Sequence, residues 1–193
     1  INLDNTVPLI KEAACCTCGG GVGTCTVQNL EDCTNADGSW QASHPDCTGV
    51  VCRTQADGPD NCANKQAVAT GSNTPWNNYC ATTPLPEGTP VTAGNGDCGA
   101  GLNMQADLWY TWTANADCDV VIETCDVGGE IDTMMTIYTD HTGTCPCPTS
   151  AANEIDCSDD GCVFNGSASR ITLPATQGTC YTIRVAGFAG EKG

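Results

Sequence analysis

Residues 181–186 read YTIRVA, which is the clearest β-strand pattern in the chain. The apolar residues Tyr181, Ile183 and Val185 alternate with polar residues at positions 182 and 184. Because successive side chains of a strand point to opposite faces, the pattern predicts a strand with an inward apolar face. The polar face, with Thr182 and Arg184, is expected to point outward.

Four more segments combine β-branched, aromatic and aliphatic residues in short runs. They cover residues 107–113, 118–125, 133–138 and 170–173. Clusters of Gly, Asn, Asp and Pro separate these runs, as they separate the strands of antiparallel sandwiches. No long amphipathic helix pattern is present. The sequence therefore predicts an all-β fold, a disulfide-rich antiparallel β-sandwich.

Cysteine is the most unusual component of the composition. The chain has 17 cysteines among 193 residues, about 9%, a level typical of disulfide scaffolds in oxidising compartments. Seven of them lie within residues 12–52, a segment too short to bury a core of its own. We therefore expect a cysteine-stapled module over 12–52, a polar linker over 53–60 and the sandwich over 61–193. Residues 1–11 are expected to form a connecting strand.

Charge and missing motifs exclude several classes of function. With a formal net charge of −17, the chain repels phosphate backbones, so we expect no nucleic-acid binding. No apolar run approaches the roughly 20 residues of a membrane span. The motifs G-x-S-x-G, H-E-x-x-H and the Walker loop are absent, so we expect no enzyme activity. Cys15-x-x-Cys18 and Cys145-x-Cys147 lack a matched second zinc-binding pair, which favours disulfides and an extracellular or cell-surface location.

Five segments, in order and spacing, resemble the bacterial pre-peptidase C-terminal domain. They read DNCANKQAV (60–68), DLWYTWTA (107–114), EIDTMMTIY (130–138), IDCSDDGC (155–162) and TCYTIRVAGFAGEKG (179–193). The resemblance implies a non-catalytic, jelly-roll-like sandwich linked to secretion, surface attachment or adhesion, with calcium bound in some members. This chain departs from that pattern in its high cysteine content and in lacking the last strand.

A second resemblance covers residues 14–52 and concerns a short cysteine-rich module of large secreted bacterial surface proteins. The matching residues are Cys15-Cys16, Cys25, Glu31-Asp32-Cys33, Gly38-Ser39-Trp40, Asp46-Cys47 and Cys52. This resemblance implies that the chain is part of a surface protein.

The opening segment could supply the strand that the sandwich lacks. Residues 1–7 read INLDNTV, with Ile1, Leu3 and Val7 spaced for one face of a strand. An unfilled sandwich exposes unpaired backbone groups and an apolar groove, which a strand from elsewhere can fill. Three interpretations stay open: donation to a neighbouring copy or tandem repeat, self-completion, and simple truncation.

Acidic residues form the candidate metal site. Calcium prefers several oxygen ligands, and two segments that could meet at one end of an antiparallel sandwich offer carboxylates. The candidate ligands are Glu130, Asp132, Asp140, Asp156, Asp159 and Asp160. None of them fits the EF-hand loop pattern.

Three weaker features complete the candidate sites. The turn between Cys157 and Cys162 would bring them within disulfide range, so we expect that pair. Because the cysteine total is odd, one thiol stays free or bonds to another chain. Asn165 begins a glycosylation sequon. Aromatic residues could form a sugar platform, namely Trp76, Tyr79, Trp109, Tyr110 and Trp112. Trp109 and Trp112 lie on opposite faces of one strand, so at least one faces outward. The alternative, which we favour, is that the inward residues belong to the core and the outward one covers a sheet face.

Together these features predict an extracellular structural subunit or repeat of a surface fibre. Its copies are expected to join head to tail by strand complementation, with disulfides and calcium stabilising the assembly. The alternative is a secreted adhesion or carbohydrate-binding module of a larger protein, with surface glycans as partners.

Overall fold

The structure is a computed structural model that describes residues 12–19, 22–36, 38–41, 43–50, 52, 60–71, 78, 80–81, 104–125, 131–141, 143–148, 153–163 and 166–191. The chain divides into two compact units, Ile1–Gln55 and Ala56–Gly193. Several predicted site residues lie outside the described residues, namely Ile1, Leu3, Val7, Trp76, Tyr79, Glu130 and Asn165.

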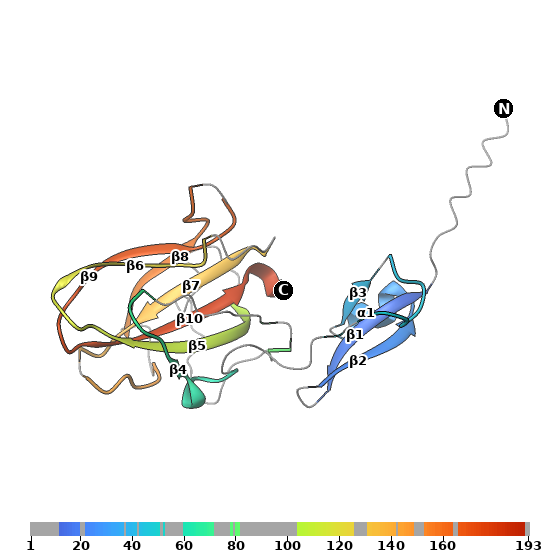
Figure 1. Ribbon diagram of the computed structural model, residues 1–193, viewed down its shortest axis with the longest axis horizontal. Coiled ribbons are helices and arrows are strands. Elements are labelled where there is room, and N and C mark those ends of the chain that lie inside the picture. The colour runs from blue at the N-terminus through green and yellow to red at the C-terminus, as the bar shows by residue number, and fades with distance from the viewer. Residues whose placement is uncertain are drawn as a thin grey trace. The chain divides into compact units, whose positions relative to one another are not determined.

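The first unit is a small three-stranded sheet (Figure 1). Strand β1 (Ala13–Gly19) pairs antiparallel with β2 (Val22–Gln28) and with β3 (Ser39–Gln41), and helix α1 (Leu30–Asn35) connects β2 to β3. The disulfides Cys15–Cys33, Cys16–Cys52 and Cys25–Cys47 cross-link these elements. Cross-links restrict the unfolded chain and so stabilise a unit of this size.

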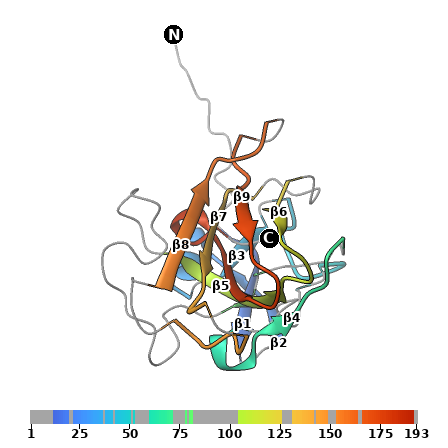
Figure 2. The same ribbon diagram turned by 90° about the vertical axis from the view of Figure 1, so that its left-hand side faces the viewer.

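The second unit is a β-sandwich with a wide and a narrow sheet. The wide sheet has the order β4-β5-β10-β7-β8, and the narrow sheet contains β6 and β9, which lie side by side (Figure 1, Figure 2). The strands are β4 (Gln66–Ala67), β5 (Gln105–Thr113), β6 (Cys118–Glu123), β7 (Thr133–Tyr138), β8 (Glu154–Asp159), β9 (Arg170–Ala175) and β10 (Cys180–Gly187). Short 3-10 helices cover Cys62–Asn64 and Phe188–Gly190.

The predicted all-β, disulfide-rich fold is confirmed. The described pairs are antiparallel except for β4 with β5, which are parallel. Among the described residues, no helix is long and apolar enough to cross a membrane. The many disulfides are those expected of a protein in an oxidising, extracellular environment.

The main core lies between the two sheets. It contains Tyr181, Ile183 and Val185 from β10, as the alternation predicted, together with Ile171 and Leu173 from β9. These side chains are shielded from water by residues of the opposite sheet. The hydrophobic period of β10 therefore identifies its inward face correctly.

The prediction that Thr182 and Arg184 point outward to solvent is wrong, since both are 2% exposed. The other face of the wide sheet carries a second buried cluster formed by Cys62, Trp109 and Tyr138, with Cys147 packed against it. The disulfide Cys62–Cys147 belongs to this cover. Thus both faces of the wide sheet are shielded.

A buried ion pair is the main polar feature of that second face. Arg184 Nε donates to Asp107 Oδ2 over 2.8 Å, and each side chain is only 2% exposed. The Arg184 guanidinium also lies 5.1 Å from the centre of the Trp109 ring and donates to the Met104 carbonyl over 3.4 Å. Loss of one partner would leave the other charge buried and uncompensated.

The predicted disulfide between Cys157 and Cys162 is wrong. Cys162 bonds to Cys125, and Cys157 is itself oxidised in another disulfide. Residues 154–159 form the extended strand β8 rather than a turn, so Cys157 lies within a paired strand while Cys162 lies beyond its end. A further disulfide, Cys145–Cys180, ties the loop after β7 to the start of β10.

We expect Asp107→Leu to destabilise the sandwich by about 3–5 kcal/mol because Arg184 would keep an unpaired buried charge. The double variant Asp107→Leu/Arg184→Met should recover most of that loss, since both charges are removed together. Denaturant unfolding of the two variants and of Arg184→Met alone measures the coupling. Equal destabilisation by the single and double variants would contradict this account of the pair.

Candidate cation site and apolar groove

An apolar groove of about 370 Å³ opens along one side of the sandwich. Its floor is the inward face of the wide sheet, with Tyr110, Trp112, Met135, Ile183 and Val185. Its two walls are residues 120–124 of the narrow sheet and residues 68–71 after β4. The groove therefore lies where the wide sheet extends beyond the narrow one.

The wall formed by β6 has a backbone edge that is not paired with another described strand. Within the described residues β6 pairs with β9 alone, so its other edge faces the groove without a partner strand. Val120 and Ile122 pack against the core but are only partly buried, and Val121 on the other face is 44% exposed. Such an apolar edge is what proteins normally cover, because it can pair with another strand.

The opposite wall is held by two hydrogen bonds to β5. The Val68 amide donates to the Thr111 carbonyl over 2.8 Å. Trp112 Nε1 donates to Thr70 Oγ1 over 2.9 Å. These bonds place the hydroxyl of Thr70 at the end of the groove where Trp112 lies.

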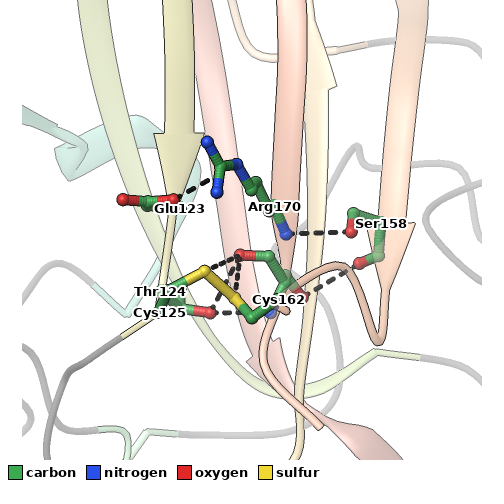
Figure 3. A network of polar contacts seen from close by, with 7 residues as sticks. Glu123, Thr124, Cys125, Ser158, Cys162 and Arg170 are labelled. Atoms are coloured by element: carbon green, nitrogen blue, oxygen red, sulfur yellow. Dashed lines mark hydrogen bonds and ion pairs between the residues drawn. A yellow bond between two sulfur atoms is a disulfide. The ribbon is translucent and has the colours of Figure 1, made fainter. Parts of the chain in front are cut away.

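A buried hydroxyl network closes the other end of the groove (Figure 3). Thr124 Oγ1 lies 2.7 Å from Thr133 Oγ1, and the Ser169 amide donates to both over 2.9 and 3.0 Å. Ser169 Oγ donates to the carbonyls of Thr133 and Ser158. The Cys125–Cys162 disulfide lies beside these residues (Figure 3). These hydrogen bonds and the disulfide together tie the end of β6 to the wide sheet.

The same network brings an acidic cluster together. Ser169 Oγ bonds to the carbonyl of Thr133, which follows Asp132, and to the carbonyl of Ser158, which precedes Asp159. The β7–β8 register also pairs Met134 with Asp159. Carboxylate oxygens of Asp132, Asp159 and Asp160 all lie within 4.8 Å of one another. Three of the six predicted calcium ligands therefore meet at this end of the sandwich.

The other predicted ligands do not join that cluster. Asp156 is three residues earlier in β8, opposite Ile137, and its Oδ1 accepts from the Cys157 amide over 2.8 Å. Asp140 follows the far end of β7, whereas Asp132 precedes the near end. An extended strand of six residues separates its ends by about 20 Å, so Asp140 cannot share a cation with Asp132.

Glu191 is a neighbour that sequence reasoning missed. Its Oε2 accepts from the Asp132 amide over 2.7 Å, and its carbonyl accepts from the buried Asn78 Nδ2 over 2.9 Å. A Cβ atom at Gly187 would overlap the main chain of Glu191, so a glycine is needed where the chain folds back. Only the tertiary path after β10 brings this carboxylate near, and no local motif signals it.

The electrostatics of the cluster fit a bound cation. Burial raises the pKa of Asp132, and the negative charges of Asp159, Asp160 and Glu191 raise it further. Burial also raises the pKa of Asp159, with Asp160 adding to the effect. One buried oxygen of Asp132 and one of Asp159 have no hydrogen-bond partner among the described residues. Hard oxygen ligands of this kind suit Ca²⁺.

For the aromatic residues that the structure describes, burial and not a sugar platform is the correct interpretation. Trp109 and Trp112 do lie on opposite faces of β5, but they are 0% and 5% exposed because both faces of the wide sheet are covered. Tyr110 is buried as well. Among the described cysteines Cys118 alone is a free thiol, and it is exposed at the start of β6.

We expect Ca²⁺ to raise the melting temperature of chelator-treated protein at neutral pH. A ligand at about one hundred times its Kd stabilises by about 2.7 kcal/mol, or roughly 5–10 °C for a domain of this size. Asp159→Asn should abolish the shift, and Asp156→Asn should keep it because Asp156 lies outside the cluster. Equal shifts in the two variants, or none in the parent, would contradict the site.

Without Ca²⁺ the cluster should weaken the fold as pH rises. The folded-state pKa values of Asp132 and Asp159 lie above their ordinary value of 3.8, so the folded state binds more protons than the unfolded state near that range. The contribution of the Asp132 and Asp159 carboxyl groups to the free energy of unfolding is therefore greatest in acid, and it falls as pH rises through their raised pKa values. Melting curves of the parent and Asp159→Asn between pH 4 and pH 7 should diverge accordingly, and parallel curves would contradict the shift.

No family model, curated protein or solved structure matches this chain. The resemblance to the pre-peptidase C-terminal domain is therefore untested, and no relative supplies a function. The groove, the β6 edge and the acidic cluster are the observations on which a function can be based.

Proposed function

We propose that this chain is an extracellular structural subunit of a surface fibre, in which a strand from one copy completes the sandwich of the next. The unpartnered edge of β6 above an apolar groove is the observation that supports this function most directly. A strand added there would satisfy the backbone groups of β6 and cover Val120 and Ile122.

Residues 1–7 of a neighbouring copy are the proposed occupant. Ile1, Leu3 and Val7 would face the groove together with Asn5, and Asn2, Asp4 and Thr6 would face solvent. Residues 1–7 contain one charged side chain, Asp4, and it lies on the solvent-facing side of the strand. The groove-facing side chains carry no charge, so the strand can enter an apolar groove without desolvating a charged side chain.

Strand exchange of this kind joins unlike surfaces of the two copies. A donor segment and an acceptor groove on every copy give a head-to-tail contact that need not close, and such contacts generate filaments. Disulfides suit a fibre that is exposed outside the cell. We also propose that Ca²⁺ at Asp132, Asp159 and Asp160 neutralises part of the acidic charge in the assembled state.

We expect Leu3→Asp to prevent fibre formation, because it places a charge on the groove-facing side of the donor strand. Asn2→Asp adds the same charge on the solvent-facing side and should leave assembly intact. Negative-stain images and sedimentation of the two variants, beside a chain lacking residues 1–7, compare them directly.

Mixing experiments separate donor from acceptor. The shortened chain keeps its groove, so it should cap parent fibres and shorten them in proportion to its concentration. Fibres that form equally well from the shortened chain would refute donation by residues 1–7. Discrete monomers of the parent that bind glycans would instead favour the adhesion or carbohydrate-binding alternative.

A further inference from the structure

We infer that the donated strand runs antiparallel to β6, with Ile1 beside Thr124 and Val7 beside Cys118. This inference rests on the proposed function and adds the edge, direction and register of the captured strand. Four observations support it: which edge borders the groove, how long that edge is, where the groove is polar, and at which end the acidic cluster lies.

The free edge of β6 receives the strand because the groove lies on that side of the narrow sheet. Residues 120–124 line the groove, and no residue of β9 does so. β9 contains Pro174, which has no N–H to donate, and the Arg170 amide at its start already donates to Ser158 Oγ over 3.0 Å. β6 contains no proline.

The length of the donor matches this edge. Seven extended residues span about 23 Å, and β6 with Thr124 also comprises seven residues. In an antiparallel register Ile1 lies opposite Thr124, Leu3 opposite Ile122, Asn5 opposite Val120 and Val7 opposite Cys118. All four donor residues then share the face that Val120 and Ile122 present to the core.

The polar end of the groove selects the direction. Thr70 lies at the Trp112 end, and β5 passes through a short turn there into Cys118 and Val120. At the other end the floor is apolar, with Met135 and Val185 paired across β7 and β10, and the hydroxyls of Thr124 and Thr133 already bond to each other and to Ser169. The antiparallel strand brings Asn5 toward the Thr70 hydroxyl. The parallel strand would bury the Asn5 amide beside Ile122, away from that hydroxyl, which is unfavourable.

Charge favours the same direction. The Thr124 end adjoins the acidic cluster, because Thr124 contacts Thr133 and Thr133 follows Asp132. Residues 12–193 of the donor carry a net charge of −17, since residues 1–11 are neutral overall. The antiparallel strand leads this acidic remainder out at the Cys118 end, away from Asp132, Asp159 and Asp160.

Cys118 provides a native reporter for the register. In the full chain, Val7→Cys should form an intermolecular disulfide with Cys118 in the presence of oxidised glutathione, because opposite residues of paired strands lie within bridging range. Ile1→Cys would lie about 20 Å away and should cross-link at least tenfold less. The matched control is each variant combined with Cys118→Ser, which should lose the bond. Non-reducing gels measure the yield, and mass spectrometry of the linked peptides identifies the two cysteines.

The outcomes separate this inference from the proposed function. Cross-linking of Ile1→Cys rather than Val7→Cys would overturn the direction while supporting donation. If neither variant cross-links, while Leu3→Asp still prevents fibre formation, the proposed register on β6 is wrong but strand donation is not. Fibres that persist without residues 1–7 would refute the proposed function and this inference together.

Discussion

The free edge of β6 is the constraint on which the rest of this molecule depends. Among the described residues the wide sheet has five strands, and the sheet that faces its apolar inner side has two, β6 and β9. The groove over Tyr110, Trp112 and Met135 lies beside the β6 edge, and these three side chains are already 6%, 5% and 1% exposed. A further strand would therefore add stability mainly by pairing the β6 backbone and by covering Val120 and Ile122, which are only partly buried.

Covalent and polar links hold the sandwich together beside the open edge of β6. Cys125 and Cys162 are 37 residues apart in sequence, and closing a loop of that size contributes about 4 kcal/mol in the chain-entropy model. The Ser169 hydroxyl joins Thr133 to Ser158 at the same end. These links keep β6 in place while its outer edge stays open. They also fix the acidic cluster, which is the candidate cation site, at the same end of the sandwich.

Local pattern predicted five of the strands, β5, β6, β7, β9 and β10, and the alternation in β10 identified which of its side chains meet the core. The pattern could not show that a second layer covers the other face. Arg184 looked like a solvent-facing residue, and only the tertiary positions of Asp107 and Trp109 make its burial possible. The expectation that at least one of Trp109 and Trp112 faces outward is wrong for the same reason.

Long-range pairings limited the prediction of the sites. Asp132 was placed near Asp159 because antiparallel neighbours bring strand ends together, and the β7–β8 register does this. Sequence proximity suggested a Cys157–Cys162 bond, but β8 is extended and Cys162 bonds to Cys125 across the sandwich instead. The carboxylate of Glu191 reaches the cluster through a fold-back that no spacing rule describes.

Amide hydrogen exchange of β6 tests the central claim most directly. Half of the amides of an edge strand point away from its only partner, and in β6 these should exchange rapidly in unassembled protein. In assembled material the account predicts at least tenfold slower exchange for these β6 amides, with the amides of β9 that already bond to β6 changing little. Equal exchange of β6 in the two states would show that no strand adds to this edge and would contradict the account.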